Sequence, residues 1–308
     1  MEKEEKGLTN VYKIDTEEKI NKFKIFLVVS VVILVILLYL VLLNTIKIAK
    51  SKKVYKQYAN QLITLQEKEE ERRAKEEAEE EKRKQERTPN LTEEGRENIK
   101  HLYSSENKIA YLTFDDGPSE VTTNILDTLK QENIKATFFV LGNNVNLYPD
   151  YLKRIYEEGH FIGNHGYTHV YSSIYSSPEA VLDEFNRCND AVKNVIGNPE
   201  YNSHLFRFPG GLVGGKYAAI KEQAKILLNE NNIVNVDWNA LNGDAETNDL
   251  SSEFELQRLR ETTDNKNVVV ILMHDAPLKK VTAETLPQII AYLREQGYEF
   301  RTFYDIIK

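Results

Sequence analysis

The pattern of hydrophobic and polar positions divides the chain into three parts, of which the first contains a long apolar run. Residues 1–24 mix lysines with acidic residues and predict no compact element. Residues 25–43 read IFLVVSVVILVILLYLVLL and carry no charge. A helix of that length spans about 28 Å, which matches the hydrocarbon core of a bilayer. No small-residue cleavage site follows, so the run predicts an uncleaved signal anchor that crosses a membrane once.

The charges beside this apolar run do not orient it. Lysines flank it on both sides, and the positive-inside rule therefore favours neither orientation. Long domains cross membranes largely regardless of such charges. We expect the C-terminal part to be extracellular on functional grounds, which leaves residues 1–24 as a cytoplasmic tail.

Residues 51–87 predict a long, solvated helical stalk. Acidic residues precede basic ones at i,i+4 spacing, the order that stabilises an isolated helix. Near its start, four apolar residues recur at helical spacing, which allows a weak dimer: Val54, Tyr58, Leu62 and Leu65. The stalk is expected to act as a spacer, and residues 88–107 are expected to form a linker.

From residue 108 to residue 308, apolar runs alternate with amphipathic segments. The predicted strands are Ile109–Phe114, Ala136–Leu141, Phe161–Asn164, Leu205–Phe208, Ile233–Trp238 and Val268–His274. The predicted helices lie near 119–132, 149–158, 178–196, 215–230, 252–263 and 283–296. Such a β-α alternation is typical of a parallel sheet, either open or closed into a barrel.

Composition excludes several classes of function. The net charge is −8 without a basic excess, which argues against a nucleic-acid partner. The chain has one cysteine, Cys188, so it can form no intrachain disulfide and is not expected to hold a cysteine-based metal site.

Two adjacent carboxylates follow the first predicted strand, in the run TFDDGP (residues 113–118). Asp115 and Asp116 repel each other, so their roles are expected to differ. A metal ion on one of them would leave the other free to act as a base. The alternative interpretation is a solvated turn at the end of a strand.

A histidine pair follows the third predicted strand, in the run NHGYTH (residues 164–169). His165 and His169, four residues apart, can converge on one ion. With Asp116 they would form a site of one carboxylate and two imidazoles, suited to zinc or another divalent transition metal. Such an ion acidifies water and polarises a carbonyl group. Alone, the pair could equally be two solvated loop histidines.

Further strand ends supply an arginine and another histidine. Arg207 opens the run RFPGG and, beside Asp115, would keep that carboxylate ionised and oriented; otherwise it forms a surface ion pair. His274 closes the run VVVILMHD and is either a general acid or a structural histidine.

The run VDWNALNGD offers partners for that histidine. A carboxylate near His274 would raise its pKa and keep it protonated, and Asp237 and Asp244 are the candidates. Trp238 in the same run either lines an apolar pocket or belongs to the core.

Together and in this order, TFDDGP, NHGYTH, RFPGG, DWNALNGD and LMHD resemble the five motifs of the polysaccharide deacetylases of carbohydrate esterase family 4, the NodB-homology domain. The resemblance covers residues 106–308. It implies a distorted (β/α) barrel and the metal-dependent removal of N-acetyl groups from polysaccharide sugars. The expected ion is Zn²⁺, with Co²⁺ or another transition metal as the alternative.

The resemblance also implies a role for each matching position. Its catalytic positions are Asp115 as the base, Arg207 as the residue that orients the base, His274 as the acid and Asp244 as the residue that tunes the acid. Its metal ligands are Asp116, His165 and His169, and its substrate pocket includes Gly210, Trp238 and Leu272. Asp237 is the second choice to Asp244.

Many members have an aromatic residue where this chain has Gly210. Its backbone N–H remains for an oxyanion, whereas a side-chain contact to the sugar is lost. We interpret His160 as a structural residue rather than a ligand.

An anchor and a stalk would hold residues 108–308, the expected catalytic domain, at the height of a cell wall. The expected substrate is therefore N-acetylglucosamine in peptidoglycan. Alternatives are N-acetylmuramic acid, a chitin-like oligosaccharide or an O-acetyl ester. In a different class, the chain would be a catalytically silent, membrane-anchored glycan-binding scaffold.

Overall fold

A computed structural model describes residues 2–247 and 249–307, with side chains from residue 18 onward. The chain divides into two compact units, Met1–Glu79 and Glu80–Lys308, which are described separately.

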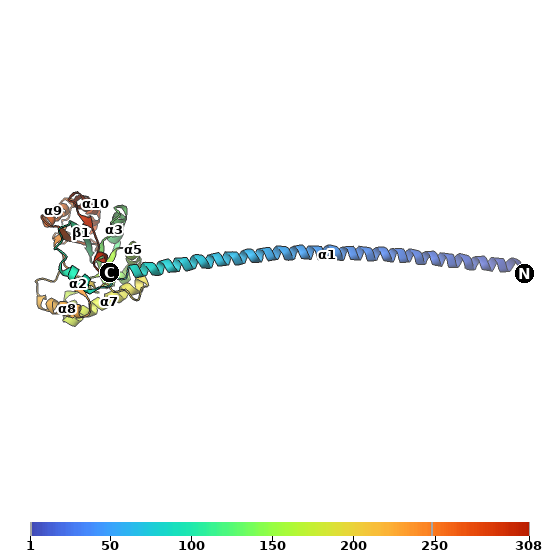
Figure 1. Cartoon of the computed structure of the whole chain (residues 1–308), viewed down its shortest axis with the longest axis horizontal. Helices are drawn as coiled ribbons and strands as arrows, with labels where there is room; N and C mark the ends of the chain where they lie inside the picture. Colours follow the sequence, from blue (N-terminus) through green and yellow to red (C-terminus); the bar gives the residue numbers. More distant parts are fainter. Residues whose placement is uncertain (1, 248, 308) are drawn as a thin grey trace. The chain divides into compact units, whose positions relative to one another are not determined.

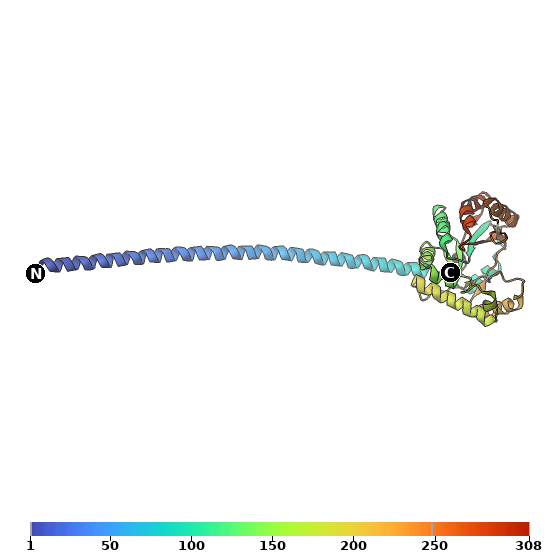
Figure 2. The same cartoon turned by 180° about the vertical axis from the view of Figure 1, so that it is seen from behind.

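The first unit consists of helix α1 (Glu2–Glu86), which continues into the second unit (Figures 1 and 2). Among the described residues it is the one helix long and apolar enough to cross a membrane, and its apolar window is unburied. In the stalk, Lys75 pairs with Glu71 and Lys84 with Glu80, as the charge order predicts. The helix also includes residues 2–24, where the sequence predicted no element.

The second unit is built on a parallel sheet. Its strands are β1 (Ile109–Asp115), β2 (Thr137–Val140), β3 (Phe161–Asn164), β4 (Leu205–Phe206), β5 (Val234–Asn235), β6 (Ala240–Leu241), β7 (Val268–His274) and β8 (Glu299–Phe300). Their order is β5-β4-β3-β2-β1-β7-β6, and β8 also pairs with β1. Within the described ranges no pairing joins β5 to β6, so the barrel is open there. The predicted distorted (β/α) barrel is confirmed.

Helices surround this sheet (Figures 1 and 2). They are α2 (Glu93–Lys100), α3 (Glu120–Gln131), α4 (Gly142–Leu147), α5 (Pro149–Glu157), α6 (Tyr171–Ile174), α7 (Pro178–Ile196), α8 (Ala218–Glu230), α9 (Ser252–Thr263) and α10 (Lys280–Glu295), followed by a 3₁₀ turn, Phe303–Asp305. The longer helices lie where the sequence predicted them. The short elements α2, α4, α6, β6 and β8 were not predicted, because few residues leave little periodicity to detect.

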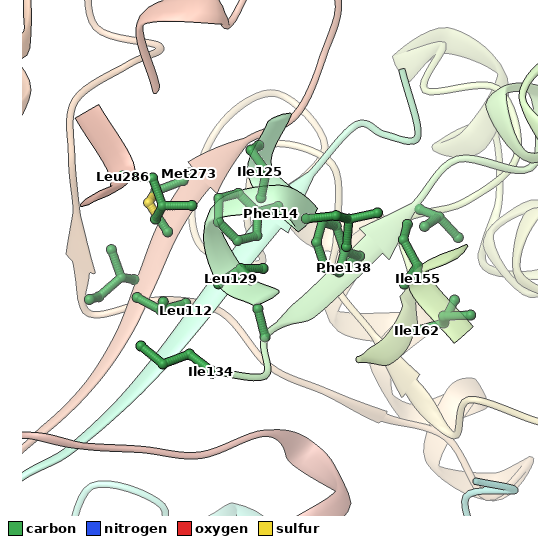
Figure 3. Packing of buried hydrophobic residues seen from close by; sticks show 14 of the residues in the cluster. Leu112, Phe114, Ile125, Leu129, Ile134, Phe138, Ile155, Ile162, Met273 and Leu286 are labelled. Carbon is green, nitrogen blue, oxygen red and sulfur yellow. The ribbon is translucent and has the colours of Figure 1, made fainter. Parts of the chain in front are cut away.

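Strand β1 is buried on both faces, which explains its uninterrupted apolar sequence. Leu112 and Phe114 face outward and pack with Ile125 and Leu129 of α3 (Figure 3). Tyr111 belongs to the cluster on the other face, inside the barrel. Because side chains alternate along a strand, Thr113 and Asp115 lie on the same inner face as Tyr111. The strand therefore directs the first carboxylate of TFDDGP into the barrel.

Residues 88–107, the expected linker, belong to the second unit and pack against its barrel. They include α2, which begins at an N-cap where the Thr92 hydroxyl accepts a 3.1 Å hydrogen bond from Gly95 N. Leu91 and Leu102 are buried in the inner cluster. Two buried leucines in a polar stretch give too weak a pattern to predict this packing.

Arg87, which follows α1 and belongs to the second unit, contacts helix α5. Its Nη1 donates to the carbonyl oxygens of Tyr156 and Glu157 at 2.8 and 3.0 Å, and its own carbonyl accepts from the Tyr304 hydroxyl at 2.9 Å. A guanidinium at the last carbonyls of α5 also interacts favourably with the helix dipole. Since β3 begins just after α5, this contact lies at the edge of the sheet where the strands begin.

Candidate active site

Asp115, the last residue of β1, forms a buried ion pair with Arg207. Arg207 Nη1 donates to Asp115 Oδ1 at 2.8 Å and to the Thr113 hydroxyl at 2.7 Å. The guanidinium lies over the Phe139 ring, 4.0 Å from its centroid. The structure therefore brings the two residues together as the sequence predicted. Thr113 was missed, although a threonine in an apolar strand marks a position that needs a polar partner.

The charge state of Asp115 reflects two opposed effects. Burial raises the pKa of its carboxyl group, and the nearby Arg207 charge lowers it without cancelling the rise. Arg207 occupies Oδ1, whereas Oδ2 lies 3.8 Å from Nε2 of His165. One oxygen is thus fixed and the other is directed into the site.

Asp116, His165 and His169 form the one cluster of potential metal ligands found among the described residues. Asp116 Oδ1 lies 3.5 Å from His165 Nε2 and 3.4 Å from His169 Nε2. Ligand atoms about 2.0–2.1 Å from a tetrahedral ion lie about 3.3 Å apart, so this spacing fits zinc-like coordination. Asp116 Oδ1 is also buried without a hydrogen-bond partner in the described structure. The three residues therefore fit a divalent cation.

The local backbone and a carbonyl group prepare this cluster. Asp116 and His169 have left-handed backbones, with φ of 73° and 59°, a strained conformation often found at functional sites. His165 Nδ1 lies 2.8 Å from the Arg207 carbonyl oxygen, which can only accept, so Nε2 keeps its lone pair for an ion. Burial lowers the pKa of His165 to about 3, which keeps it neutral, as a ligand must be.

Glu184, which the sequence reasoning missed, braces the loop that carries the histidines. Its Oε2 accepts from the backbone N–H groups of Tyr167 and Thr168 at 2.6 and 2.7 Å, and its Oε1 accepts from the Thr168 hydroxyl at 2.8 Å. Glu184 is buried on α7 beside Phe185. An acid within the apolar stripe of a helix was the available signal.

His274 lies at the end of β7, directly opposite Asp115 in the β1–β7 register. Asp244 Oδ1 lies 2.7 Å from His274 Nδ1, and Oδ2 accepts from the His274 backbone N–H at 2.8 Å. Burial lowers the pKa of His274, but the hydrogen bond and charge of Asp244, together with the charges of Asp115 and Asp116, outweigh it and raise the pKa to about 9. At neutral pH this imidazole is therefore cationic, with Nε2–H free of Asp244.

Asp237, the second choice for that role, has a different contact. Its Oδ2 accepts from Leu212 N at 2.9 Å, and its carbonyl accepts from Arg207 Nη2 at 3.4 Å. It supports the loop after RFPGG rather than the histidine. Of the two candidates, Asp244 is the one that contacts His274.

Trp238 and Leu272, two of the three expected pocket positions, lie near Arg207 and His274. Trp238 is half-buried, with Arg207 5.8 Å from its ring, and a Cβ built on Gly211 would lie 3.1 Å from it. Leu272 lies two residues before His274 in β7 and therefore shares its face. Within the described residues, the Gly210 N–H donates no hydrogen bond and remains available.

Tyr171 occupies the space beside Gly210, a relationship that the sequence did not reveal. A Cβ on Gly210 would lie 2.5 Å from the Tyr171 hydroxyl oxygen, and the backbone there has a φ of 73°. The Tyr171 ring lies 5.4 Å from that of His169. Glycine at position 210 thus makes room for a tyrosine next to the metal-site residues.

His160 lies apart from this constellation. It precedes β3 and hence lies at the opposite edge of the sheet, where its Nδ1 accepts from Ala136 N at 3.1 Å. Burial lowers its pKa to about 3. These contacts agree with a structural role.

Comparison with known proteins agrees with this geometry. Residues 103–227 match the family model described as polysaccharide deacetylase. A peptidoglycan-N-acetylglucosamine deacetylase of Bacillus cereus is 35% identical over 203 residues, which cover 65% of this chain and 71% of that protein.

Solved structures show the same likeness. A Streptococcus mutans CE4 esterase superposes with a TM-score of 0.61 and 33% identity, covering 67% of this chain and 90% of that one. The catalytic domain of a peptidoglycan N-acetylglucosamine deacetylase from Eubacterium rectale gives 0.59 and 34%, covering 64% and 88%. The chain belongs to the polysaccharide deacetylase family, carbohydrate esterase family 4.

Proposed function

We propose that this chain is a metal-dependent N-deacetylase that acts on N-acetylglucosamine in peptidoglycan. The observation that carries the proposal is the convergence, at one edge of the sheet, of an ion-paired carboxylate, a cluster suited to a cation and a protonated histidine. Hydrolysis of an acetamide needs a base, an electrophilic centre and an acid for the leaving amine.

Asp115 is proposed as the base. Its Oδ2, left free by the bond from Arg207 to Oδ1, would accept a proton from the attacking water. Burial raises the pKa of this carboxyl group, which strengthens it as a proton acceptor. Arg207 would hold the carboxylate in one orientation throughout the reaction.

Asp116, His165 and His169 are proposed to hold the cation, with Zn²⁺ as the ion that best suits one carboxylate and two imidazoles. Such an ion supplies Lewis acidity to a carbonyl oxygen and acidifies water. The protein's part is to keep both histidines neutral and oriented, through the Arg207 carbonyl at His165 and the Glu184 carboxylate behind the loop.

His274 is proposed as the acid. Asp244 holds Nδ1, so Nε2–H would donate its proton to the amine nitrogen as the C–N bond breaks and acetate leaves. The Gly210 N–H would donate to the developing oxyanion. Trp238 and Leu272 would line the space for the acetyl methyl group, where an apolar wall excludes water.

The substrate is inferred from relatives whose names specify peptidoglycan N-acetylglucosamine. The test has two parts. Purified protein loaded with zinc should release acetate from N-acetylglucosamine oligosaccharides, and a chelator should abolish the release. Muropeptides from a deletion strain should gain acetylated glucosamine by mass spectrometry. Acetate release with unchanged muropeptides would contradict the peptidoglycan substrate but not the chemistry, and no release would contradict both.

Residues 25–43 are proposed as a single membrane anchor, with the barrel outside the cell. The support is an unburied apolar helix in a relative of cell-wall enzymes. Residues 51–87 would then be a spacer, and the exposed Val54, Tyr58 and Leu62 would allow weak dimerisation. Membrane fractionation tests this: the full chain should sediment with membranes, and a variant that lacks residues 25–43 should not.

A further inference from the structure

Tyr171 opens helix α6, two residues after His169, and its ring contacts two other aromatic rings. The centroids of the His169 and Tyr175 rings lie 5.4 and 5.7 Å from its own. The Tyr175 hydroxyl donates to the Pro209 carbonyl oxygen at 2.7 Å. These contacts tie α6 to the chain just before Gly210 and hold the Tyr171 ring beside that glycine.

The Tyr171 hydroxyl group has unused hydrogen-bonding capacity. Among the residues that the structure describes, it has no hydrogen-bond partner, and the residue is 40% exposed. Tyr175, one helical turn further on, shows what a purely structural tyrosine looks like here, because it is only 2% exposed and its hydroxyl is bonded to Pro209. Tyr171 shares neither feature, so its hydroxyl remains available to a ligand as a donor and an acceptor.

This hydroxyl lies beside the backbone group that is proposed to bind the oxyanion. A Cβ built on Gly210 would lie 2.5 Å from the Tyr171 hydroxyl oxygen. The oxygen is therefore within about 4 Å of the Gly210 Cα, since one C–C bond separates Cα from Cβ. An acetamide whose carbonyl oxygen accepts from the Gly210 N–H would bring its own sugar ring close to Tyr171. In N-acetylglucosamine, the ring carbon next to the one that carries the acetamide bears a hydroxyl group.

We propose that Tyr171 is a substrate-binding residue, whose hydroxyl donates a hydrogen bond to the ring hydroxyl next to the acetamide of N-acetylglucosamine. The inference rests on the proposed deacetylase function, in which the Gly210 N–H binds the acetamide oxygen. Glycine at position 210 gives the tyrosine this place, because a Cβ there would collide with the hydroxyl. The loop that carries the histidines thus supplies the sugar contact that position 210 cannot supply in this chain.

Tyr171→Phe tests the contact, because it removes the hydroxyl and keeps the ring. Binding of the N-acetylglucosamine tetrasaccharide is measured by calorimetry in zinc-loaded, full-length protein, with Asp115→Asn in every variant so that the sugar is not consumed. We expect Kd to rise roughly threefold to tenfold, as for the loss of one hydrogen bond. Tyr292→Phe is the matched control, since its hydroxyl lies 3.5 Å from the Thr263 hydroxyl, ahead of β7 and away from the site. Its Kd should not change.

The space shared by positions 171 and 210 gives a second test. In Gly210→Ala the new methyl group would lie 2.5 Å from the Tyr171 hydroxyl, whereas in the Tyr171→Phe background the nearest remaining atom is ring carbon Cζ, at 3.2 Å. The strain of alanine at a φ of 73° is common to both backgrounds. Gly210→Ala should therefore raise Kd by a factor about three times larger, or more, beside tyrosine than beside phenylalanine. Equal factors in the two backgrounds would overturn the inference.

Zinc affinity separates loss of the sugar contact from damage to the metal site. Competition with a zinc-binding dye should give equal affinities for wild type and Tyr171→Phe, because Tyr171 is not among the proposed ligands. Unchanged sugar binding in Tyr171→Phe, or a matching loss of zinc affinity, would also overturn the inference. Weakened sugar binding in that variant, together with no acetate release by the wild type, would contradict the proposed function and leave the contact standing.

Discussion

Asp115 and Arg207 are joined by a 2.8 Å hydrogen bond, and neither side chain is more than 2% exposed. Removal of one partner from a buried ion pair leaves the other charge uncompensated. We expect Arg207→Met to lower the free energy of unfolding by about 3–5 kcal/mol, measured by urea denaturation. Arg301→Met, at a partly exposed ion pair, should cost about 1 kcal/mol or less. Equal losses in the two variants would contradict the importance of the buried pair.

Asp115→Asn tests the base directly. The amide keeps the shape of the carboxylate but cannot take a proton, so kcat should fall roughly 10²–10⁴-fold. Bound metal, measured by mass spectrometry of the purified protein, should remain, because Asp115 is not among the three proposed ligands. Turnover close to wild type would rule Asp115 out as the base.

The proposed ligands can be tested by metal content alone. His165→Ala and His169→Ala each remove an imidazole from a cluster whose ligand atoms all lie within 4.8 Å of one another. Both variants should copurify with far less zinc than wild type. His101→Ala is the matched control, since that histidine is exposed on the chain before β1. Full zinc occupancy in either ligand variant would place the cation elsewhere.

Glu184 should matter for metal affinity although it touches no ion. Glu184→Ala removes three hydrogen bonds from the loop between His165 and His169, and we expect zinc affinity to fall roughly 10–100-fold. The neighbouring, exposed Asp183→Ala should have little effect. Competition with a zinc-binding dye gives both values, and identical affinities would show that the loop needs no brace.

The His274–Asp244 pair predicts a pH dependence. The pKa of His274 rises from an ordinary 6.5 to about 9 in the folded protein. Its stabilising effect is therefore complete below 6.5 and is lost as the pH rises through about 9. Activity that needs the imidazolium should fall over the same alkaline range.

Asp244→Asn should move that alkaline limb to lower pH, because the burial that lowers the pKa of His274 remains while the opposing charge is gone. A pH–rate profile of both proteins measures the shift. A limb that stays in place would assign it to a group other than His274.

The sequence predicted the long strands and helices because their patterns are strong. Val268–His274 is an unbroken apolar strand, and Pro178–Ile196 is a long amphipathic helix capped by Ser177. It also predicted which side chains would meet, since the carboxyl ends of parallel strands lie at one edge of a sheet.

Such patterns could not predict contacts between single residues that come from distant segments of the chain. Nothing in the sequence near Glu184 points to the loop at Tyr167, and nothing near Tyr171 points to Gly210. Arg87 and Leu91 look like ordinary stalk and linker residues until the fold places them against α5 and the inner cluster. These contacts join residues that are far apart in the sequence, and the local periodicity of hydrophobic and polar residues does not encode them.

The position of Arg87 has a consequence for a polymeric substrate. It fastens the chain at the edge where the strands begin, whereas Asp115 and His274 lie where strands end. The contact of Arg87 and the candidate catalytic residues thus lie at opposite edges of the sheet. The contact of Arg87 with α5 therefore lies away from the edge that a glycan would have to reach to meet Asp115 and His274.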